Sequence, residues 1–360
     1  MNVNRSRFQR HLLRWFLRYK RDLPWRSFGS HQKKISPYHI LVVEVMLQQT
    51  QIKTVIPYYR RWLRAFPTVQ AFARAPLDRV LKLWEGLGYY SRARNLHQAA
   101  KIIVERFEGE IPNDPEELMK LPGIGRYTAG AVSSIAFQKA VPLVDGNVAR
   151  VLARVFNLRE DISKPKTHEK LYELANTLLF RKEPGTFNQA LMELGSLICI
   201  PEMPKCHLCP VANDCIAFRR GSAWRLPIRS GKTEVKKIDM VIGVICKNGK
   251  LLVRRRPARG IWGGLWEIPG TIHTKAQTPE EALKQELRAG LGLQVKIEKK
   301  LPLLEHRFTH RKAQIQPFVC SVRKPSNRQA FGADWRWADP SQLKTLSFPR
   351  PHQKIIKDHF

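Results

Sequence analysis

Acidic residues are scarce in this chain: 30 Asp and Glu stand against 63 Lys and Arg, which gives a formal net charge of +33. An excess of this size goes well beyond what solubility requires. It predicts a polyanionic partner, and nucleic acid is the commonest one. Binding to a ribosome or to an anionic membrane surface is the alternative.

Long hydrophobic runs are also missing. No apolar stretch approaches the roughly 20 residues that cross a bilayer, and the basic N-terminus lacks the apolar core of a signal peptide. We therefore predict no membrane partner and interpret residues 9–20 as a basic amphipathic helix, although a mitochondrial presequence has a similar composition. Internal repeats and low-complexity segments are absent from the sequence as well.

What the chain does contain is enough apolar sequence for two domains. It has 360 residues, of which 43% are hydrophobic and nine are tryptophan, as is typical of a folded protein. We predict an all-α region over 1–220, a polar and basic linker over 221–236, and an α+β domain over 237–360. In the first region, further helices are expected at 38–56, 55–65, 69–73, 76–84, 92–107, 115–120, 128–137, 147–156, 167–181 and 186–198. In the second, strands are expected at 240–246, 251–254, 315–322 and 335–337, with a helix at 279–289.

The segment LPGIG at 121–125 predicts a tight turn followed by a helix. Gly123 and Gly125 let the backbone approach a ligand closely, and the amides that open the next helix are unpaired and slightly positive. A phosphate is the natural ligand of such a corner, so we expect the turn to hold a nucleic-acid backbone. An ordinary αα-hairpin with a glycine turn is the alternative.

Two carboxylates are candidates for chemistry. Asp145 follows the apolar stretch 141–144 and should emerge beside whatever the turn holds, although it could simply cap a helix that starts near Asn147. Glu44 lies on the apolar helix 38–56, where burial would raise its pKa toward that of a general acid at neutral pH. The alternative is that Glu44 faces solvent or pairs with an arginine.

Two polar or aromatic segments could contact bases. The segment 48–51, QQTQ, is suited to hydrogen-bonding a base edge or a sugar. In the segment 87–90, LGYY, a leucine between glycines and two aromatic residues could enter a base stack. A glycine helix cap with core aromatics is the alternative for the second segment.

Four cysteines lie close together in the chain. The spacing C-x6-C-x2-C-x5-C joins Cys199, Cys206, Cys209 and Cys215, which indicates a metal site or a disulfide knot. The lack of a secretion signal disfavours disulfides. Zinc sites usually consist of two C-x2-C pairs separated by a longer loop, so the asymmetric spacing favours an iron–sulfur cluster.

Together these motifs resemble the MutY-type adenine DNA glycosylases of the endonuclease III superfamily. The matching segments, besides the four cysteines, are EVMLQQTQ (44–51), GLGYYSRARNLH (86–97), LPGIGRYTAG (121–130) and VDGNVARVLAR (144–154). The resemblance covers nearly the whole chain and implies a helix-hairpin-helix glycosylase fold with a [4Fe–4S] cluster. It also implies a monomer acting on double-stranded DNA, in the cytoplasm with the nucleoid, or in the nucleus or mitochondria of a eukaryote.

The reaction implied by the resemblance is removal of adenine mispaired with 8-oxoguanine or guanine. Glu44 would protonate the adenine N7, Asp145 would stabilise the oxocarbenium-like sugar, and Tyr127 and Asn147 would orient water and Asp145. The bifunctional branch of the superfamily has a Schiff-base lysine where Tyr127 stands, so we predict a monofunctional glycosylase. The loop 27–36 is longer than is usual for the family. The substrate-binding residues carried over from the family are Trp25, Arg26, Gln49, Tyr89 and Gln189. Thr50 and Leu87, from the two segments described above, are further candidates for substrate binding.

The C-terminal domain resembles the Nudix fold in the segment 260–270, GIWGGLWEIPG, and in the helix 279–289. A Nudix hydrolase has R-E-L-x-E-E on this helix, whereas residues 285–290 read QELRAG, so Mg²⁺-dependent hydrolysis is not expected. The resemblance instead implies recognition of 8-oxoguanine by Phe308, Thr309 and His310. The family commonly has Phe-Ser-His there, and threonine keeps the hydroxyl while adding a methyl group.

Two other functions compete with this interpretation. One is a bifunctional glycosylase and lyase for oxidised pyrimidines, against which Tyr127 and the Nudix-like domain argue. The other is a DNA-damage binder without catalytic activity, against which the presence of both Glu44 and Asp145 argues.

Overall fold

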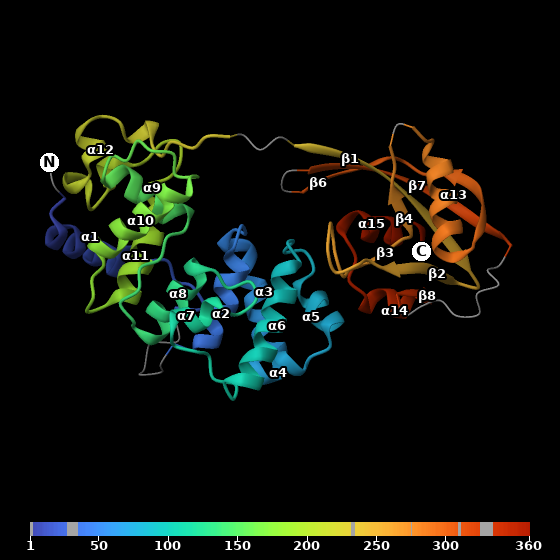
Figure 1. The fold of residues 1–360 in the computed structure, drawn as a ribbon, viewed down its shortest axis with the longest axis horizontal. Helices are drawn as coiled ribbons and strands as arrows, with labels where there is room; N and C mark the ends of the chain where they lie inside the picture. Colours follow the sequence, from blue (N-terminus) through green and yellow to red (C-terminus); the bar gives the residue numbers. More distant parts are fainter. Residues whose placement is uncertain (1–2, 27–34, 232–234, 275, 309–310, 325–333) are drawn as a thin grey trace. The chain divides into compact units, whose positions relative to one another are not determined.

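The computed structural model describes residues 3–26, 35–231, 235–274, 276–308, 311–324 and 334–360 (Figure 1). It divides into two compact units, one combining residues 1–75 with 94–231 and the other combining 76–93 with 232–360. Residues 221–231, which the sequence assigns to a linker, thus group with the first unit. In the described part of the chain, no helix is both long enough and apolar enough to cross a membrane.

The first unit is helical. Its α-helices are α1 (Arg5–Tyr19), α2 (Pro37–Leu47), α3 (Ile52–Ala65), α4 (Val69–Arg74), α6 (Ser91–Arg106), α7 (Pro115–Met119), α8 (Arg126–Phe137), α9 (Gly146–Val155), α10 (Pro165–Leu178), α11 (Pro184–Leu197) and α12 (Ile216–Arg219). Short 3₁₀ turns follow α11 at Cys206–Leu208, Ala212–Asp214 and Ala223–Arg225. Helix α8 packs against α2 and α11, and α11 also packs against α9, so these four helices form the frame of the site.

The predicted helix 38–56 is wrong, because the structure divides it into two helices. Helix α2 begins after Ser36, whose side chain caps it, and ends at Leu47, where the apolar sequence stops. Gln49 has a φ of 56°, in the left-handed region that a continuing helix excludes. Helix α3 then starts at Ile52. The polar residues 48–51 thus form the break between two helices and not the end of one.

The second unit is built on a mixed sheet. Its elements are α5 (Leu77–Trp84), β1 (Lys236–Lys247), β2 (Lys250–Arg255), β3 (Trp266–Glu267), β4 (Gly270–Ile272), α13 (Pro279–Leu291), β5 (Gln294–Lys300), β6 (Leu304–Phe308), β7 (Arg311–Lys324), β8 (Trp335–Ala338), α14 (Pro340–Thr345) and α15 (Arg350–His359). The path of the sheet is β3-β2-β1-β7-β5, in which β1 and β7 are parallel and the other neighbours are antiparallel.

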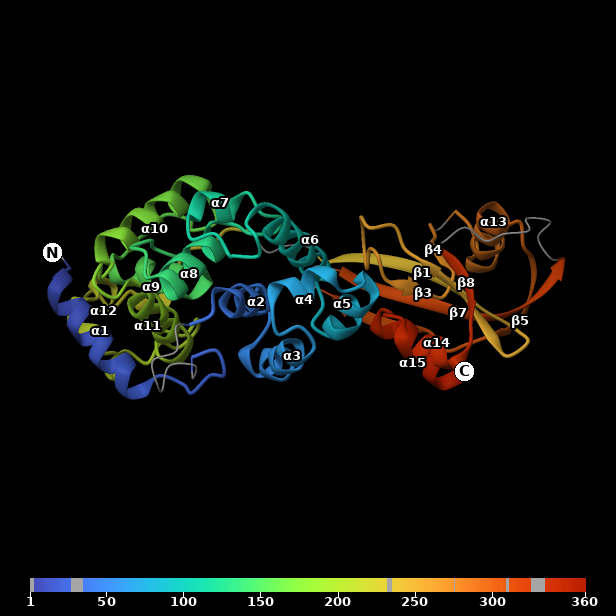
Figure 2. The same ribbon diagram turned by 90° about the horizontal axis from the view of Figure 1, so that it is seen from below.

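Strand β1 has a core on each face, because successive side chains of a strand point to opposite faces. Met240, Ile242 and Val244 pack with side chains of α14 and α15, whereas Val241 and Ile245 pack with α13. Figure 2 shows α13 on one side of the sheet and α14 and α15 on the other. An all-α unit followed by an α+β unit confirms the predicted fold class.

Candidate active site

The predicted glycine turn joins α7 to α8 and leaves the start of α8 open. Gly123 has a φ of 77°, and a Cβ there would lie 2.7 Å from the Cβ of Asn95. Gly125 is the N-cap of α8 and provides no side-chain acceptor for its first amides. The helix therefore presents N–H donors at its N-terminus, which is the geometry that phosphate binding requires.

Glu44 lies on α2 with only 4% of its surface exposed. The hydroxyl of Tyr127, on α8, donates a hydrogen bond of 2.5 Å to Oε2 of Glu44. Burial raises the pKa of Glu44 to about 7. The charge of Asp145 also raises it, while the Tyr127 hydrogen bond and Arg26 oppose the shift. Near neutral pH the carboxyl group is therefore about half protonated. The alternative of a solvent-facing Glu44 is excluded.

Asp145 is the N-cap of α9. Its Oδ1 accepts a 2.7 Å hydrogen bond from the amide of Val148, and its Oδ2 accepts one of 3.0 Å from Nδ2 of Asn147. Burial raises the pKa of Asp145, whereas these hydrogen bonds and the charge of Arg150 lower it. The capping role that the sequence left as an alternative is thus present, and the same carboxylate also faces the cleft described next.

A single cleft of about 1690 Å³ in the helical unit is lined by both carboxylates. Trp25 is 6% exposed and contacts the ring of Tyr59 edge-on, with centroids 5.5 Å apart. Trp224 and Arg225, at the other end of the helical unit's sequence, also line the cleft, and the tryptophan is 63% exposed. The site residues predicted from the sequence that line this cleft are Trp25, Arg26, Glu44, Gln49, Thr50, Tyr127, Asp145, Asn147 and Gln189.

Other predicted site residues do not line this cleft. Leu87 is buried in the loop that groups with the second unit, and Tyr89 in the same loop has a φ of 47° with the Arg92 guanidinium 5.4 Å from its ring. Phe308 ends β6 in the second unit. Thr309 and His310 lie outside the described residues.

Sequence reasoning missed an ion-pair network on the wall of the cleft. Glu193 is 1% exposed and pairs with Arg21 at 2.8 Å and with Arg26 at 3.1 Å. Arg26 Nε also donates a 3.1 Å hydrogen bond to Oε1 of Gln189. The signal available in the sequence was spacing, because Gln189 and Glu193 are four residues apart and therefore share one face of α11.

Arg150 was also missed, and it connects the Asp145 segment to the cysteine segment. Its Nη2 donates to Oδ1 of Asn147 at 2.9 Å and to the carbonyl of Gly195 at 2.7 Å. Its Nε donates to the carbonyl of Cys199 at 2.7 Å. The first predicted metal ligand and the partner of Asp145 are therefore held by one side chain.

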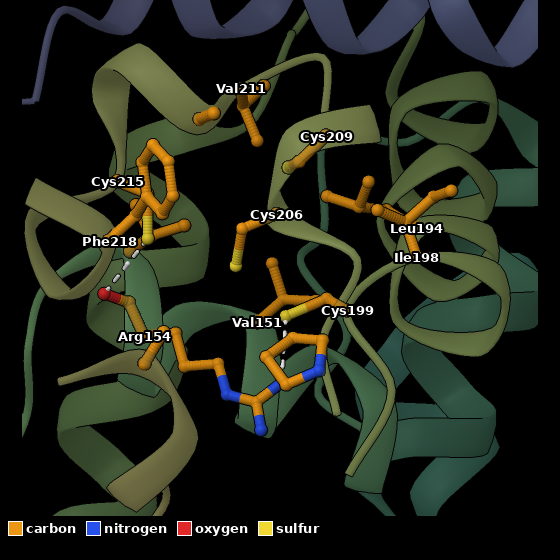
Figure 3. A pocket seen from close by; sticks show the side chains of 14 residues that line it. Val151, Arg154, Leu194, Ile198, Cys199, Cys206, Cys209, Val211, Cys215 and Phe218 are labelled. Atoms are coloured by element: carbon orange, nitrogen blue, oxygen red, sulfur yellow. Dashed lines mark hydrogen bonds between the residues drawn. The ribbon is translucent and has the colours of Figure 1, made fainter. Parts of the chain in front are cut away.

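The four predicted cysteine ligands lie around one small cavity, whose other walls are apolar except for Arg154 (Figure 3). The guanidinium of Arg154 donates a 3.3 Å hydrogen bond to Sγ of Cys199. Among the described residues, no three His, Cys, Asp or Glu side chains converge closely enough to share one metal ion. Four cysteine thiols that line one cavity are the donor set that an iron–sulfur cluster takes. The residues present therefore fit an iron–sulfur cluster.

Two acidic residues of the Nudix-like elements, Glu267 and Glu286, are paired with arginines. Glu267 of β3 is 1% exposed. It forms an ion pair with Arg254, in which Oε1 lies 2.8 Å from Nη2 of the arginine, and a second ion pair with Arg256. Glu286 of α13 pairs with Arg254 at 2.5 Å. Carboxylates neutralised by arginines are poor ligands for Mg²⁺, which agrees with the interrupted acidic motif of this helix.

Comparison with known proteins separates the same two parts of the chain. The HhH-GPD superfamily of base excision DNA repair proteins matches residues 42–177, and the NUDIX domain family matches residues 240–358. In solved structures, a thermostable thymine-DNA glycosylase superimposes with a TM-score of 0.54 at 28% identity, covering 60% of this chain and 97% of that one. The fold is shared with a non-covalent endonuclease III–DNA complex. That structure superimposes with a TM-score of 0.50 at 23% identity, covering 61% of this chain and 98% of that one.

Curated relatives match nearly the whole chain. The adenine DNA glycosylase of Rattus norvegicus is 36% identical over 97% of this chain and 77% of its own length. That of Homo sapiens is 35% identical over 97% of this chain and 73% of its own length. The bacterial one from Buchnera aphidicola of Schizaphis graminum is 32% identical over 97% of this chain and 98% of its own. The chain therefore belongs to the adenine DNA glycosylases, a family of base excision repair enzymes, as its motifs predict.

Proposed function

We propose that the chain is a monofunctional glycosylase that removes adenine mispaired with 8-oxoguanine, or with guanine, from duplex DNA. The observation that carries this proposal is the cleft that holds Glu44 beside Asp145. One carboxyl group has a pKa of about 7, and the other is held by amide donors at a helix cap. A proton donor next to a second carboxylate is the pair that cleavage of a glycosidic bond uses.

The proposed reaction begins when the adenosine leaves the base stack and enters the cleft. Glu44 gives its proton to N7 of adenine, and the electrons of the bond between C1′ and N9 then pass to the protonated base, which leaves as neutral adenine. The sugar becomes an oxocarbenium-like cation, which the charge of Asp145 stabilises until water attacks C1′. The proton that the water loses returns to the carboxylate of Glu44. Tyr127 holds Glu44 by its hydrogen bond, and Asn147 holds Asp145.

The remaining residues of the helical unit would bind the substrate. Trp25, Arg26 and Gln189 would surround the extruded adenine, while Gly123 and Gly125 would present backbone amides to a DNA phosphate. Gln49 and Thr50 would enter the position that the extruded base leaves in the stack. In the second unit, Leu87 and Tyr89 would make contacts of their own with bases.

A lyase activity is the competing function, and the residue at position 127 argues against it. A lyase needs an amine that attacks C1′, and at this position the chain has a tyrosine whose hydroxyl is engaged with Glu44. Lys53 also lines the cleft, so the absence of a Schiff base has to be tested directly. Borohydride trapping of enzyme on DNA measures it, and we expect no covalent product.

The Nudix-like domain would recognise 8-oxoguanine and not hydrolyse nucleotides. Phe308 lies against Trp262 with ring centroids 5.3 Å apart, and His306 stacks on Phe308 at 5.8 Å. An aromatic group at the end of β6 suits contact with a base. Phe308, Thr309 and His310 would form the contact. We assign residues 1–220 to the glycosylase region, 221–236 to a linker and 237–360 to this recognition domain.

We propose that Cys199, Cys206, Cys209 and Cys215 hold a [4Fe–4S] cluster, which would serve as a structural element that fixes a DNA-binding loop. Substituting Cys206→Ser should remove the visible absorbance of the purified protein and reduce its iron content. Cys246→Ser is the matched control, because Cys246 is an exposed cysteine of β1. If both variants keep their iron, the assignment is refuted.

The proposed enzyme acts as a monomer on DNA, in the cytoplasm with the nucleoid or in the nucleus or mitochondria of a eukaryote. Its test is single-turnover release of adenine from duplexes that carry adenine opposite 8-oxoguanine, guanine or thymine. We expect release from the first two, abolished by Glu44→Gln and retained by Glu160→Gln, since Glu160 forms only an exposed ion pair with Lys170. Binding of the lesion duplex without any base release would refute the proposal.

A further inference from the structure

Three side chains form a continuous hydrogen-bonded path along one wall of the cleft. Glu193, Arg26 and Gln189 are its members, and Gln189 and Glu193 lie one turn apart on α11. Arg26 bridges them, with Nη2 donating to Oε2 of Glu193 at 3.1 Å and Nε donating to Oε1 of Gln189 at 3.1 Å. Gln189 faces the same cleft as Glu44.

The guanidinium of Arg26 is fixed at every nitrogen. Besides the two bonds just described, its Nη1 donates to the carbonyl of Arg21 at 3.3 Å, and its Cζ lies 5.3 Å from the centroid of the Phe16 ring. Only 13% of the Arg26 side chain is exposed. A planar guanidinium that is hydrogen-bonded at three nitrogens has one orientation. That orientation determines how the side chains bonded to its edges must turn.

Glu193 is the anchor of this path. Its Oε1 accepts hydrogen bonds from the backbone amide and Nε of Arg21, at 2.9 and 2.8 Å. Burial raises the pKa of Glu193, but the hydrogen bonds from Arg21 and Arg26 outweigh burial and bring it to about 2. The carboxylate is therefore charged at any pH at which the enzyme works, and Arg26 has a permanent partner.

The path determines which end of the Gln189 amide is oxygen and which is nitrogen. Arg26 has only donors, so the amide must turn its oxygen toward Nε of Arg26. Its Nε2 donates to the carbonyl of Gly185 at 3.3 Å. A reversed amide would place NH₂ against a guanidinium donor and a carbonyl against a carbonyl. The oxygen keeps one free acceptor site, and the nitrogen keeps one free N–H.

We propose that Glu193 is a positioning residue that makes the cleft selective for adenine over guanine-like bases, by fixing Arg26 and through it the amide of Gln189. This inference rests on the proposed function. The Watson–Crick edge of adenine has a donor at N6 and an acceptor at N1, which match the oxygen and nitrogen of the fixed amide. Guanine and hypoxanthine have an acceptor at O6 and a donor at N1, so each would meet a like group.

Hypoxanthine is the probe that tests this inference. It keeps N7 and the glycosidic bond of adenine and reverses only the hydrogen-bonding pattern at N1 and position 6. Single-turnover release of adenine and of hypoxanthine, each opposite 8-oxoguanine in the same duplex, gives a rate ratio for each variant. The variants are Glu193→Gln, Arg26→Lys and Gln189→Leu, with Glu160→Gln as the surface ion-pair control.

We expect Glu193→Gln to lower the adenine-to-hypoxanthine ratio by at least about tenfold, because the released amide can turn toward either base. Arg26→Lys should have the same effect while leaving the pair between Glu193 and Arg21 intact, so it decides the question if Glu193→Gln does not fold. In a Gln189→Leu background, Glu193→Gln should not change the ratio further.

Two results would overturn the inference. Equal slowing of both bases would assign Glu193 a general structural role, and an unchanged ratio in Arg26→Lys would exclude control of the amide. Failure of the wild-type protein to release adenine at all would instead refute the proposed function itself. The two failures are therefore distinguishable within one experiment.

Discussion

The raised pKa of Glu44 predicts a specific dependence of base release on pH. An ordinary glutamate with a pKa of 4.5 would be protonated in only about 0.3% of molecules at pH 7. With its pKa at about 7, roughly half of the molecules carry the proton. If proton donation by Glu44 drives the reaction, burial thus increases the active fraction at pH 7 by a factor of about 150.

The assay is single-turnover release of adenine from a duplex with 8-oxoguanine opposite, measured across the range from about pH 5 to 9. Above about pH 7 the rate should fall tenfold for each unit of pH, because the protonated fraction of Glu44 does. At the acid end the rate should fall as Asp145 loses its charge. Because burial raises the pKa of Asp145, this limb should lie above the range of an ordinary aspartate.

The reasoning would be refuted by a rate that stays constant between about pH 7 and 9. It would also be refuted by a Glu44→Gln variant that retains the wild-type rate and profile. The control is Glu160→Gln, whose carboxylate is exposed and lies outside the cleft. Its profile should superimpose on that of the wild type.

Four further predictions follow from the same contacts. Tyr127→Phe removes a hydrogen bond that lowers the pKa of Glu44, so the alkaline limb of the rate profile should move to higher pH, and an unmoved limb would exclude this coupling. Glu44→Gln should be more stable than the wild type above pH 7 and equal to it below pH 4.5, because between these values the side chain of Glu44 releases its proton only in the unfolded wild type. The difference in the free energy of unfolding should reach roughly 3 kcal/mol. Urea unfolding at both extremes of pH measures it, and equal stability of the two proteins at high pH would contradict the prediction. Gly195→Ala would place a methyl carbon 2.7 Å from Cβ of Asn147. The free energy of unfolding should therefore fall by about 1–3 kcal/mol, and base release should become slower. Wild-type values of both quantities would show that α9 and α11 can move apart to accept the methyl group. The net charge of +33 predicts that affinity for any duplex falls steeply between about 50 and 200 mM salt, and titrations with a flat salt dependence would count against extensive phosphate contacts.

The elements that sequence reasoning could predict are those with strong local signals. The glycine turn before α8, the cap at Asp145 and the apolar helix that carries Glu44 each depend on a few neighbouring residues. The four cysteines depend on spacing alone. For these features the local pattern and the tertiary structure favour the same outcome, which is typical of sequences that fold reliably.

The elements that the sequence did not predict depend on tertiary contacts. Strand β5, QVKIEKK, is mostly polar and becomes a strand by pairing with β7. Helix α15 has few apolar residues, and its buried side chains, His352 and Ile355 among them, pack in the core beneath the sheet. The break between α2 and α3 depends on the left-handed conformation of Gln49, and no nearby glycine in the sequence indicates such a conformation.

The network around Glu193 illustrates the same limit within the site. Its members form two sequence-local pairs, 21 with 26 and 189 with 193, and 163 residues separate Arg26 from Gln189. A buried glutamate beside an arginine-rich helix could equally pair with many of the 63 basic residues. Which arginines it pairs with is decided by the packing of α11 against α1, a long-range contact that no local pattern encodes.

The hydrogen bonds that oppose burial differ between the two cleft carboxylates, because each lies at a different place on its helix. Glu44 is in the interior of α2, where the backbone amides are already bonded within the helix, so burial is opposed chiefly by the hydroxyl of Tyr127. Asp145 is at the N-cap of α9, where unpaired amides and the positive end of the helix favour an anion. The hydrogen bonds that start α9 are therefore the same ones that oppose the rise in the pKa of Asp145 that burial causes. The hydrogen bond by which Asp145 caps α9 is thus also a hydrogen bond that favours the charged form of this carboxyl group. A substitution that removes the cap removes this stabilisation as well.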